Sequence, residues 1–587
     1  MPDQQHSLFD TAPAPWELDD AELARIAEVV FTEAPWGPYS YAVPERLAAE
    51  VEPGRRIRVP LGRGNRSLVG WCTSVETRPV GRRKLKPVAG VVDRPPLPAA
   101  HMLELTRWLA EYYLCESRQP LLGVVPAGVR TQAGSREQVF VEASPEGLMA
   151  LAAGELPAKQ IAVLRVISKS PEPQPPEVLA RLAGGSLSTV NTLRKKGLLR
   201  TVRRRVQKEG EAAAVPAREA AHHLHPEQQA ALTAILEPLE QQRHATLLLH
   251  GVTGSGKTEV YIQAIERVVS FGRQAIVLVP EISLTPQTCG RFRSRFDRVA
   301  VLHSRLSDVE RHREWREIAA GRIDVIVGAR SAVFSPAPHL GLIVIDEEHD
   351  ASFKQDQTPR YHAREVARKR AEQLQIPLVL GSATPSLEVW QAALAGSIER
   401  LSLPTRVLGR TMPEVAAIDL RTEFASRAQR GAVSRQLELA MGRALDDGGQ
   451  VILLLNRRGY ATHIQCPGCG HTMECPDCSI ALTHHRAEDL AICHWCDYRI
   501  PAPHTCPACG FGGIRFAGLG TQRLEAEISS RFPHAPCLRM DSDSMQKPGS
   551  HEQALTAFRE GRIRILLGTQ MIAAWRVVRN VTLVGVL

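Results

Sequence analysis

A glycine-rich loop near the middle of the chain contains the residue types of a phosphate-binding site. Residues 251–258 read Gly-Val-Thr-Gly-Ser-Gly-Lys-Thr, and they follow a short apolar run and precede a helical pattern. In this context backbone N–H groups face phosphate oxygens, the lysine reaches the β- and γ-phosphates, and the threonine hydroxyl binds Mg²⁺. We therefore expect the residues that bind ATP to be Gly251, Gly254, Ser255, Gly256, Lys257 and Thr258.

Two acidic residues, Asp346 and Glu347, end another apolar run. A carboxylate at the end of a strand can join the coordination shell of Mg²⁺, and a neighbouring glutamate can orient or deprotonate the attacking water. We expect Thr258 and Asp346 to hold the Mg²⁺ that accompanies ATP. We expect Lys257, Asp346 and Glu347 to be the catalytic residues. The small polar turn at 381–384 ends the next strand and could sense the γ-phosphate through its hydroxyls.

Upstream of the loop, Gln228 lies in a Pro-Glu-Gln-Gln stretch. Its amide could bind the edge of the adenine base, because an amide both donates and accepts hydrogen bonds. The alternative is that Gln228 is a surface residue, as an isolated glutamine usually is.

Aromatic and basic residues alternate just after the acidic pair. This pattern suits the stacking of bases on aromatic rings together with contacts to phosphates, so strand binding could be coupled to hydrolysis. In the alternative interpretation, Phe353 and Tyr361 are core aromatics. The expected DNA-binding residues in this segment are Phe353, Lys354, Arg360, Tyr361 and Arg364.

Four Cys-x-x-Cys pairs follow in the second half of the chain. Each pair can present two thiolates to a tetrahedral zinc ion, so four pairs make two Cys₄ sites. Such sites have no open coordination position, and we expect both ions to be structural. The spacing leaves open which pairs share an ion. The pairs are Cys466/Cys469, Cys475/Cys478, Cys493/Cys496 and Cys506/Cys509.

Composition narrows the class of protein. The chain has 587 residues, of which 44% are hydrophobic and 23% charged, as expected for several packed domains. Its formal charge of +9 favours an anionic partner such as nucleic acid. No apolar run could span a bilayer, and the first residues lack the pattern of a secretion signal. We expect a cytoplasmic protein with no membrane partner.

The residues around the loop predict strands that are buried on both faces. Short apolar runs at 275–279, 342–345 and 378–380 are each followed by loop residues and then by a helical pattern. Parallel strands covered by crossover helices have this appearance. Similar runs occur on both sides of the cysteines, at 451–455 and 563–567. We therefore expect a multidomain α/β protein with two RecA-like lobes.

Changes of pattern along the chain predict the domain boundaries. Short apolar runs separated by Gly and Pro indicate a small β-rich module, and three helices followed by a strand indicate a winged-helix domain. Winged helices contact proteins as often as DNA, so both partners stay open for this domain. The expected segments are a loose tail at 1–22, the β-rich module with a helix at 23–130, the winged-helix domain at 155–206, a linker at 207–222, the ATP-binding lobe at 223–405, and a second lobe at 406–587 with a zinc-binding insert at 466–509.

These motifs resemble those of the bacterial replication-restart DNA helicases, the PriA or primosomal protein N-prime family of helicase superfamily 2. Few families place such a cysteine block inside the second lobe, and the resemblance extends over nearly the whole chain. The matching stretches are residues 251–261, 279–287, 328–331, 346–350, 360–364, 381–386 and 456–460, together with the eight paired cysteines.

The resemblance implies an ATP-dependent 3′-to-5′ DNA helicase that recognises stalled or abandoned replication forks and initiates primosome assembly. It implies that the N-terminal module binds the 3′ end of the nascent leading strand. The implied partners are forked and single-stranded DNA, primosome proteins with the helicase loader, the replicative helicase, and single-strand-binding protein. It also implies a nested zinc pairing, with Cys466, Cys469, Cys506 and Cys509 on one ion and Cys475, Cys478, Cys493 and Cys496 on the other.

Two stretches depart from the family pattern. The family has Phe-Asp-Tyr in its 3′-end pocket where this chain has Tyr39-Ser40-Tyr41, so the acidic ligand of the terminal hydroxyl is absent from that position. Arg63 stands where the family has a basic residue. After residue 573 the family's Lys-Gly…Phe-Pro run is replaced by Ala-Trp-Arg-Val-Val-Arg-Asn, and the chain stops at Leu587. The resemblance therefore leads us to expect a truncated second lobe that lacks an arginine finger.

The second departure motivates an alternative function. An arginine finger contributes about 10³–10⁵ in rate in related NTPases. The chain could therefore be a fork-binding primosome scaffold that holds nucleotide but hydrolyses it poorly. A further alternative, an RNA helicase or a restriction-type translocase with zinc knuckles, shares the motor but not the N-terminal modules.

Overall fold

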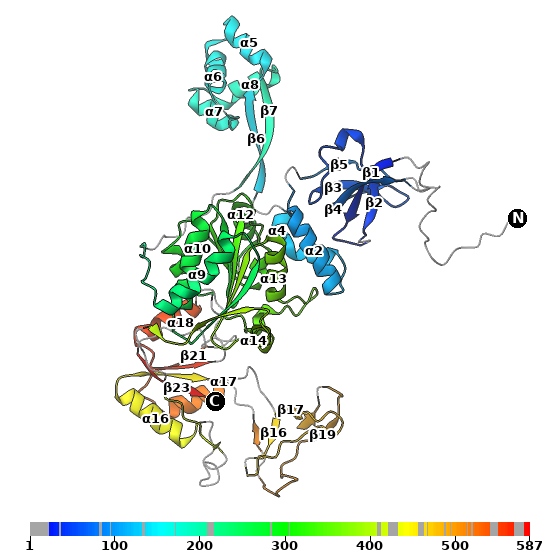
Figure 1. The fold of residues 1–587 in the computed structure, drawn as a ribbon. Helices are drawn as coiled ribbons and strands as arrows, with labels where there is room; N and C mark the ends of the chain where they lie inside the picture. Colours follow the sequence, from blue (N-terminus) through cyan, green and yellow to red (C-terminus); the bar gives the residue numbers. More distant parts are fainter. Residues whose placement is uncertain are drawn as a thin grey trace, which may run out of the picture. The chain divides into compact units, whose positions relative to one another are not determined.

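The computed structural model divides into two compact units, residues 1–410 and 411–587, which are described separately (Figure 1). It describes residues 23–34, 37–80, 85–93, 96–131, 135–170, 172–207, 217–281, 284–304, 306–407, 413–420, 433–455, 463–466, 468–485, 489–493, 495–512, 515–517, 521–540, 550–568 and 580–587.

The first unit begins with the predicted β-rich module. Its antiparallel strands lie in the order β2-β1-β4-β3-β5. Alternate residues of a strand face one side of a sheet, and accordingly Ala27, Val29, Ile57 and Val59 are fully buried in the core of the module. The strands are β1 (Leu23–Val30), β2 (Tyr39–Ala42), β3 (Arg56–Leu61), β4 (Arg66–Pro79) and β5 (Gly90–Val91), with a short 3₁₀ helix η1 (Glu45–Leu47).

Three helices follow the β-rich module and pack on the ATP-binding lobe. They are α2 (Ala100–Tyr112), α3 (Arg118–Val124) and α4 (Ala127–Arg130). Leu105 and Leu109 of α2 share one buried core with residues of the lobe such as Phe334 and Val366. The helix that we placed in the module at 23–130 therefore contributes to the core of the lobe.

The predicted three-helix unit is present, with one addition. Its helices α6 (Ala158–Ser168), α7 (Pro176–Leu182) and α8 (Leu187–Lys195) lie where the sequence predicted them. The predicted strand, β7 (Leu199–Gln207), pairs antiparallel with an unpredicted strand, β6 (Ser135–Ala143), and the extra helix α5 (Pro145–Ala153) lies between them. The unit therefore starts before the predicted residue 155. Of the predicted linker, residues 208–216 lie outside the described residues.

The ATP-binding lobe is built on a parallel sheet in the order β10-β11-β9-β12-β13-β8-β14. Helices cover both faces of this sheet (Figure 1), and the two faces contribute to separate hydrophobic cores. This arrangement confirms the α/β prediction. The strands are β8 (Ala245–Gly251), β9 (Gln274–Leu278), β10 (Val299–Leu302), β11 (Val325–Gly328), β12 (Leu340–Asp346), β13 (Pro377–Ser382) and β14 (Glu399–Leu403).

The neighbours β12, β13 and β8 bring the predicted catalytic segments to one edge of the sheet. Carboxyl ends of parallel strands are the usual ligand sites of such sheets, and here they carry Asp346, Ser382 and Gly251. The helical elements of the lobe are α9 (Pro226–Glu240), α10 (Lys257–Ser270), α11 (Pro286–Arg293), α12 (Asp308–Ala319), η3 (Arg330–Phe334), η4 (Ala351–Phe353), α13 (Ala363–Leu374) and α14 (Leu387–Leu394).

The second unit contains a smaller parallel sheet, in the order β21-β22-β15-β23. Its elements are α16 (Arg435–Asp446), β15 (Gln450–Leu454), α17 (Thr521–Arg531), β21 (Cys537–Met540), α18 (Ser550–Arg559), β22 (Ile565–Gly568) and β23 (Val581–Val586). The motif at 456–460 and residues 569–579, which include most of the stretch that departs from the family pattern, lie outside the described residues.

The cysteine-rich segment is inserted between β15 and α17 as a separate antiparallel sheet, in the order β19-β18-β17-β16-β20. The strands are β16 (His463–Gln465), β17 (Thr483–His485), β18 (Leu490–Ile492), β19 (Arg499–Pro501) and β20 (Arg515–Ala517). In the described part of the whole chain, no helix has the length and apolar character needed to cross a membrane.

Candidate nucleotide site and zinc centres

The glycine-rich loop joins β8 to α10 in the geometry of a phosphate cradle. Gly254 and Gly256 both have φ of +83°, in the left-handed region that residues with a side chain rarely adopt. Lys257 is buried, and its ammonium group donates to the carbonyl of Gly251 at 2.7 Å. Among the described residues, the buried hydroxyl of Ser255 has no hydrogen-bond partner. The loop therefore holds donors that a phosphate group would satisfy.

Gln228 is a buried brace of this loop, not a surface residue. Its Nε2 donates to the carbonyl of Ser255 at 2.8 Å, and its Oε1 accepts from the N–H of His225 at 2.8 Å. A Cβ at position 256 would lie only 2.2 Å from Gln228 Nε2. The loop can therefore lie this close to the amide only with glycine at position 256. The amide is thus placed beside the phosphate loop and supports the loop itself.

Asp346 ends β12 and lies beside Gly381 of β13. Its Oδ1 accepts from the backbone N–H of Glu347 at 3.1 Å and from the hydroxyl of Tyr261 at 3.4 Å. Tyr261 is on α10, three residues after Thr258, and is buried. Burial, followed by the charges of Asp346 and Glu347, raises the pKa of Tyr261 well above its ordinary value of 10.0. The hydroxyl therefore stays protonated and donates. No role for Tyr261 was predicted from the sequence, in which its partner Asp346 lies 85 residues away.

The two residues after the acidic pair connect β12 to the turn that follows β13. Glu348 is 1% exposed and accepts from the N–H of Ser386 at 2.7 Å and from the guanidinium of Arg364 at 3.0 Å. His349 Nδ1 lies 2.8 Å from the hydroxyl of Ser382, which is fully buried. The acidic turn is therefore linked directly to Ser382 and Ser386, and Ser382 belongs to the turn at 381–384 that was predicted to sense the γ-phosphate.

The proposed site suits ATP and Mg²⁺ by the chemistry of its donors. A carboxylate at Asp346 and a hydroxyl at Thr258 are the oxygen ligands that Mg²⁺ prefers, usually with substrate phosphates and waters completing its shell. When bound, the ion neutralises the charge that develops on the phosphates. The chain itself supplies the cradle at the amino end of α10 and the acidic pair across the sheet edge.

Two predicted DNA contacts are corrected by the structure. Phe353 is 1% exposed and Tyr361 is 6% exposed, and both belong to the core that α2 shares with the lobe. The ring of Tyr361 packs edge-on against Phe334, with centroids 5.0 Å apart. Neither ring offers a face to a base here. Interleaved aromatic and basic residues look alike in sequence whether the rings stack on bases or fill a core.

The basic residues of the same segment divide into two kinds. Arg364 is tied to Glu348 and to the hydroxyl of Ser386 at 2.7 Å, so the structure does not support a role in DNA contact. Lys354 and Arg360 are exposed, and the ammonium group of Lys354 donates to the carbonyl of Arg360. Arg63 is also exposed, in the turn between β3 and β4.

A carboxylate is present beside Ser40 although position 40 is not acidic. Glu28 on β1 lies directly opposite Ser40 on β2, and its Oε1 accepts from the Ser40 hydroxyl at 2.8 Å. The guanidinium of Arg78 on β4 binds the same Glu28 oxygen and the Ser40 hydroxyl. The sequence could not reveal this cluster, because it depends on the register of three strands.

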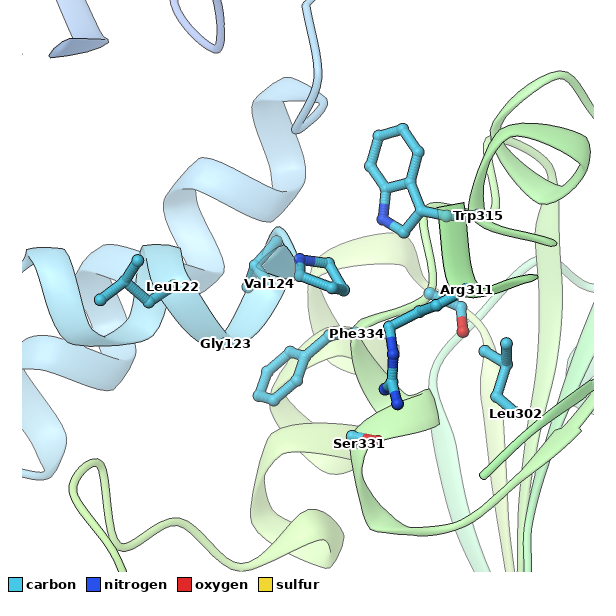
Figure 2. A pocket seen from close by; sticks show the side chains of 10 residues that line it. Leu122, Gly123, Val124, Leu302, Arg311, Trp315, Ser331 and Phe334 are labelled. Carbon is cyan, nitrogen blue, oxygen red and sulfur yellow. The ribbon is translucent and has the colours of Figure 1, made fainter. Parts of the chain in front are cut away.

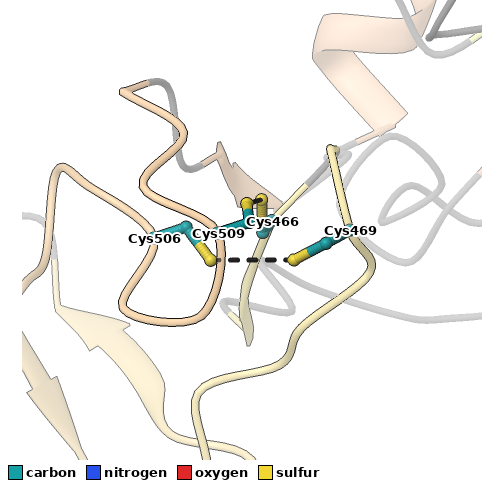
Figure 3. Close-up of side chains that lie close together, drawn as sticks. All are labelled: Cys466, Cys469, Cys506 and Cys509. Carbon is teal, nitrogen blue, oxygen red and sulfur yellow. Dashed lines mark hydrogen bonds between the residues drawn. The ribbon is translucent and has the colours of Figure 1, made fainter.

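The eight paired cysteines form two four-sulfur clusters with the nested pairing that the family resemblance implied. Within each cluster, the four Sγ atoms lie within 4.8 Å of one another. Figure 3 shows the first cluster, in which Cys466 lies 3.6 Å from Cys509 and Cys469 lies 3.7 Å from Cys506. A tetrahedral zinc with Zn–S of about 2.3 Å separates its sulfurs by about 3.8 Å. The clusters consist of Cys466, Cys469, Cys506 and Cys509, and of Cys475, Cys478, Cys493 and Cys496.

The backbone repeats the same knuckle at each pair. The fourth residue after the first cysteine donates its N–H to that cysteine's carbonyl at 2.9 Å in all four knuckles. Each of these four residues also has a positive φ. Because the turns are equivalent, each pair presents both thiolates in the same way. The four residues are Gly470, Ser479, Asp497 and Gly510.

Comparison with known proteins identifies three segments of the chain. Residues 225–392 match the DEAD/DEAH box helicase family, residues 28–126 match the 3′DNA-binding domain of PriA, and residues 475–501 match the Cys-rich region of the PriA DNA helicase. The three matches coincide with the ATP-binding lobe, with the β-rich module and its first helices, and with the zinc segment.

Whole-chain relatives agree with these segments. The replication restart protein PriA of Bacillus subtilis is 38% identical, with 94% of this chain and 76% of the relative covered. The PriA of a Synechocystis strain is 35% identical over 94% of this chain and 75% of its own length, and that of Haemophilus influenzae is 34% identical over 93% and 74%. The chain belongs to the PriA family of replication restart proteins.

Proposed function

We propose that the chain is an ATP-driven DNA helicase that recognises abandoned replication forks, unwinds DNA in the 3′-to-5′ direction and starts reassembly of the replication machinery in the cytoplasm. The observation that carries the motor function is the meeting of the phosphate loop with the acidic pair. Gly251, Asp346 and Ser382 end neighbouring strands of one sheet, which is the arrangement that ATP hydrolysis requires.

In this proposal Lys257 and Thr258 bind the phosphates and Mg²⁺, Asp346 completes the metal site, and Glu347 orients the attacking water. The Glu348–Ser386 and His349–Ser382 contacts support this function, because they join the acidic turn to the end of β13 and to the turn after it. A change at the acidic pair on hydrolysis can reach residues 382–386 through these contacts.

Three exposed cations are the proposed DNA contacts that the structure leaves available, namely Arg63, Lys354 and Arg360. For the 3′ end of the leading strand, we propose that Glu28 supplies the carboxylate that position 40 lacks. Glu28 is 2.8 Å from the Ser40 hydroxyl, so its oxygen lies where an acidic residue on β2 would place one.

The proposed partners beyond DNA are the helicase loader and other primosome proteins, the replicative helicase, and single-strand-binding protein. These partners follow from membership of the family, since relatives that carry the name replication restart protein align over more than nine-tenths of this chain. The zinc segment and the three-helix unit have their own cores, so each can present a contact surface without disturbing the motor.

The decisive experiment is ATP hydrolysis with and without a forked DNA that has a leading-strand 3′ end. Lys257→Ala should abolish fork-stimulated turnover, because the buried lysine is the cation of the phosphate cradle. Fork binding, measured by fluorescence anisotropy, should stay within about threefold of wild type, a difference below 1 kcal/mol. Lys369→Ala, which removes a half-buried lysine of α13 in the same lobe, is the matched control and should hydrolyse normally.

The results separate the helicase from the scaffold alternative. Equal turnover in Lys257→Ala and wild type would contradict the assigned ATP site. Fork binding without turnover in wild type would favour the scaffold, whose motivation is the departure from the family pattern at residues 574–580.

A further inference from the structure

The hydroxyl of Tyr261 lies in the interior of the ATP-binding lobe, where a polar group needs a partner. Tyr261 is 1% exposed, and it reaches from α10 to the edge formed by β12 and β13. Buried tyrosine hydroxyls are almost always hydrogen-bonded, because an unsatisfied one is costly. The side chain that it meets here is Asp346, with 3.4 Å between the hydroxyl and Oδ1.

Strand β13 is shaped to admit this hydroxyl. Gly381 pairs directly with Asp346 in the sheet. A Cβ at position 381 would lie 1.4 Å from the Tyr261 oxygen and 3.4 Å from Asp346 Oδ1. No residue with a side chain can therefore stand at 381 while Tyr261 keeps its position. The missing side chain at Gly381 leaves a slot, through which the Tyr261 hydroxyl of α10 reaches the Asp346 carboxylate of β12.

The two donors to Oδ1 have the same effect on the carboxylate. The N–H of Glu347 approaches Oδ1 at 3.1 Å, in addition to the tyrosine hydroxyl. A carboxylate held at one oxygen by two donors is restricted in rotation about its terminal torsion, which is otherwise broad. The direction in which its other oxygen can approach a cation is then fixed.

We propose that Tyr261 is a positioning residue of the magnesium site, whose hydroxyl holds the Asp346 carboxylate in the orientation that binds the ion. The inference depends on the proposed role of Asp346 as a Mg²⁺ ligand and adds the residue that orients it. Tyr261 does not touch ATP or the ion in this account. It acts only through Asp346.

The expected effect is moderate. Loss of a group that hydrogen-bonds to a metal ligand typically costs about 10–100-fold in metal affinity or activity. The contact of 3.4 Å is longer than a strong O–H···O bond, and the Glu347 N–H remains. We therefore expect Tyr261→Phe to reduce the gain in nucleotide affinity that Mg²⁺ provides by about threefold to tenfold. This loss lies below or at the lower end of the typical range.

The test compares the affinity for a non-hydrolysable ATP analogue in Mg²⁺ and in EDTA, by isothermal titration calorimetry on the full chain. Wild type should bind more tightly in Mg²⁺, and Asp346→Asn should lose most of this gain. Tyr261→Phe should retain the EDTA affinity but lose about threefold to tenfold of the gain. Tyr498→Phe, which removes the hydroxyl of a half-buried tyrosine in the zinc segment, should match wild type. A Mg²⁺ titration of ATP hydrolysis should show the same rise in half-saturation for Tyr261→Phe alone.

Failures of the two proposals are distinguishable. If Asp346→Asn keeps the Mg²⁺ gain, Asp346 is not a ligand and both ideas are wrong. If Asp346→Asn loses the gain while Tyr261→Phe keeps it, only the role of Tyr261 is overturned. A Tyr261→Phe chain that unfolds would show that the hydroxyl holds the fold and not the ion, which also overturns the inference.

A second variant tests the slot itself. Gly381→Ala places a methyl group where the hydroxyl lies, so it should displace Tyr261 and lower the Mg²⁺ gain as Tyr261→Phe does. Because both changes break the same contact, the double variant should lose little more than either single variant. Full additivity of the two losses would mean that they act on different contacts.

Discussion

Replacing Arg364 separates two roles that its position in the sequence cannot distinguish. The sequence suggests a DNA contact, whereas the structure places the guanidinium 3.0 Å from Glu348 Oε2, with the Glu348 side chain fully buried and that of Arg364 12% exposed. Arg364→Ala would leave the Glu348 carboxylate in the interior with only the N–H and hydroxyl of Ser386 as donors, at 2.7 and 3.1 Å.

The magnitude follows from burial. Removing one partner of a buried ion pair costs about 3–5 kcal/mol, since the remaining charge is left uncompensated. A lobe of about 180 residues shifts its melting temperature by about 2–4 °C for each kcal/mol. Arg364→Ala should therefore lower the melting temperature of the ATP-binding lobe by about 6–20 °C.

The control is Arg368→Ala on the same helix. Arg368 pairs with Glu365 and Glu372 but its side chain is 41% exposed, so its loss should cost less than about 1 kcal/mol. Differential scanning calorimetry measures the melting temperatures of both variants. A nucleotide analogue identifies the unfolding transition of the ATP-binding lobe, because a ligand that binds the folded lobe raises the temperature of that transition.

The same variants are then tested for single-stranded DNA binding at several salt concentrations. A direct phosphate contact would lower the slope of log affinity against log salt by about 0.7 for each lost contact. We expect an unchanged slope for Arg364→Ala. A normal melting temperature combined with a reduced slope would refute the buried-pair argument and restore Arg364 as a DNA contact.

The zinc clusters and the 3′-end module give two further predictions. Cys475→Ser and Cys506→Ser should each release about one of two zinc ions, measured by atomic absorption, because each belongs to a different four-sulfur cluster; Cys537→Ser, outside both clusters, should release none, and loss of both ions from either cluster variant would argue against independent sites. Glu28→Gln should reduce the preference for a fork ending in a 3′-hydroxyl over one ending in a 3′-phosphate by about threefold to tenfold, as expected for the net contribution of one hydrogen bond. Glu76→Gln, on β4 of the same sheet, is the control, and an unchanged preference in Glu28→Gln would exclude the proposed carboxylate.

The nucleotide site was predictable because its chemistry is local in sequence. The loop requires glycines, a lysine and a threonine within eight residues, and their spacing is fixed by one strand, one turn and one helix. The cysteine knuckles are equally local, since each pair closes its own turn. In both cases the sequence contains the whole unit that binds the ligand.

The contacts that support these units were not predictable, because they join distant segments. Gln228 braces the loop from 27 residues upstream, and Glu28 meets Ser40 only through strand register. Strand β6 was not predicted, because its pairing partner β7 is distant in the sequence. Ala143, the last residue of β6, pairs with Leu199, which lies 56 residues later. A pattern within one segment has no information on such partners.

Phe353 and Tyr361 show why alternating aromatic and basic residues do not by themselves indicate a DNA-binding site. Both rings lie in a buried core to which α2 contributes, and the hydroxyl of Tyr113, directly after α2, accepts from the N–H of His362 at 3.1 Å. The segment is thus held by a helix almost 250 residues earlier in the chain. With its two aromatic rings in the core, the segment offers DNA exposed cations such as Lys354 and Arg360. It follows that Tyr113, directly after α2, ties the helix that follows the 3′-end module to the segment between the acidic pair and Arg364, through its contacts with Lys354 and His362.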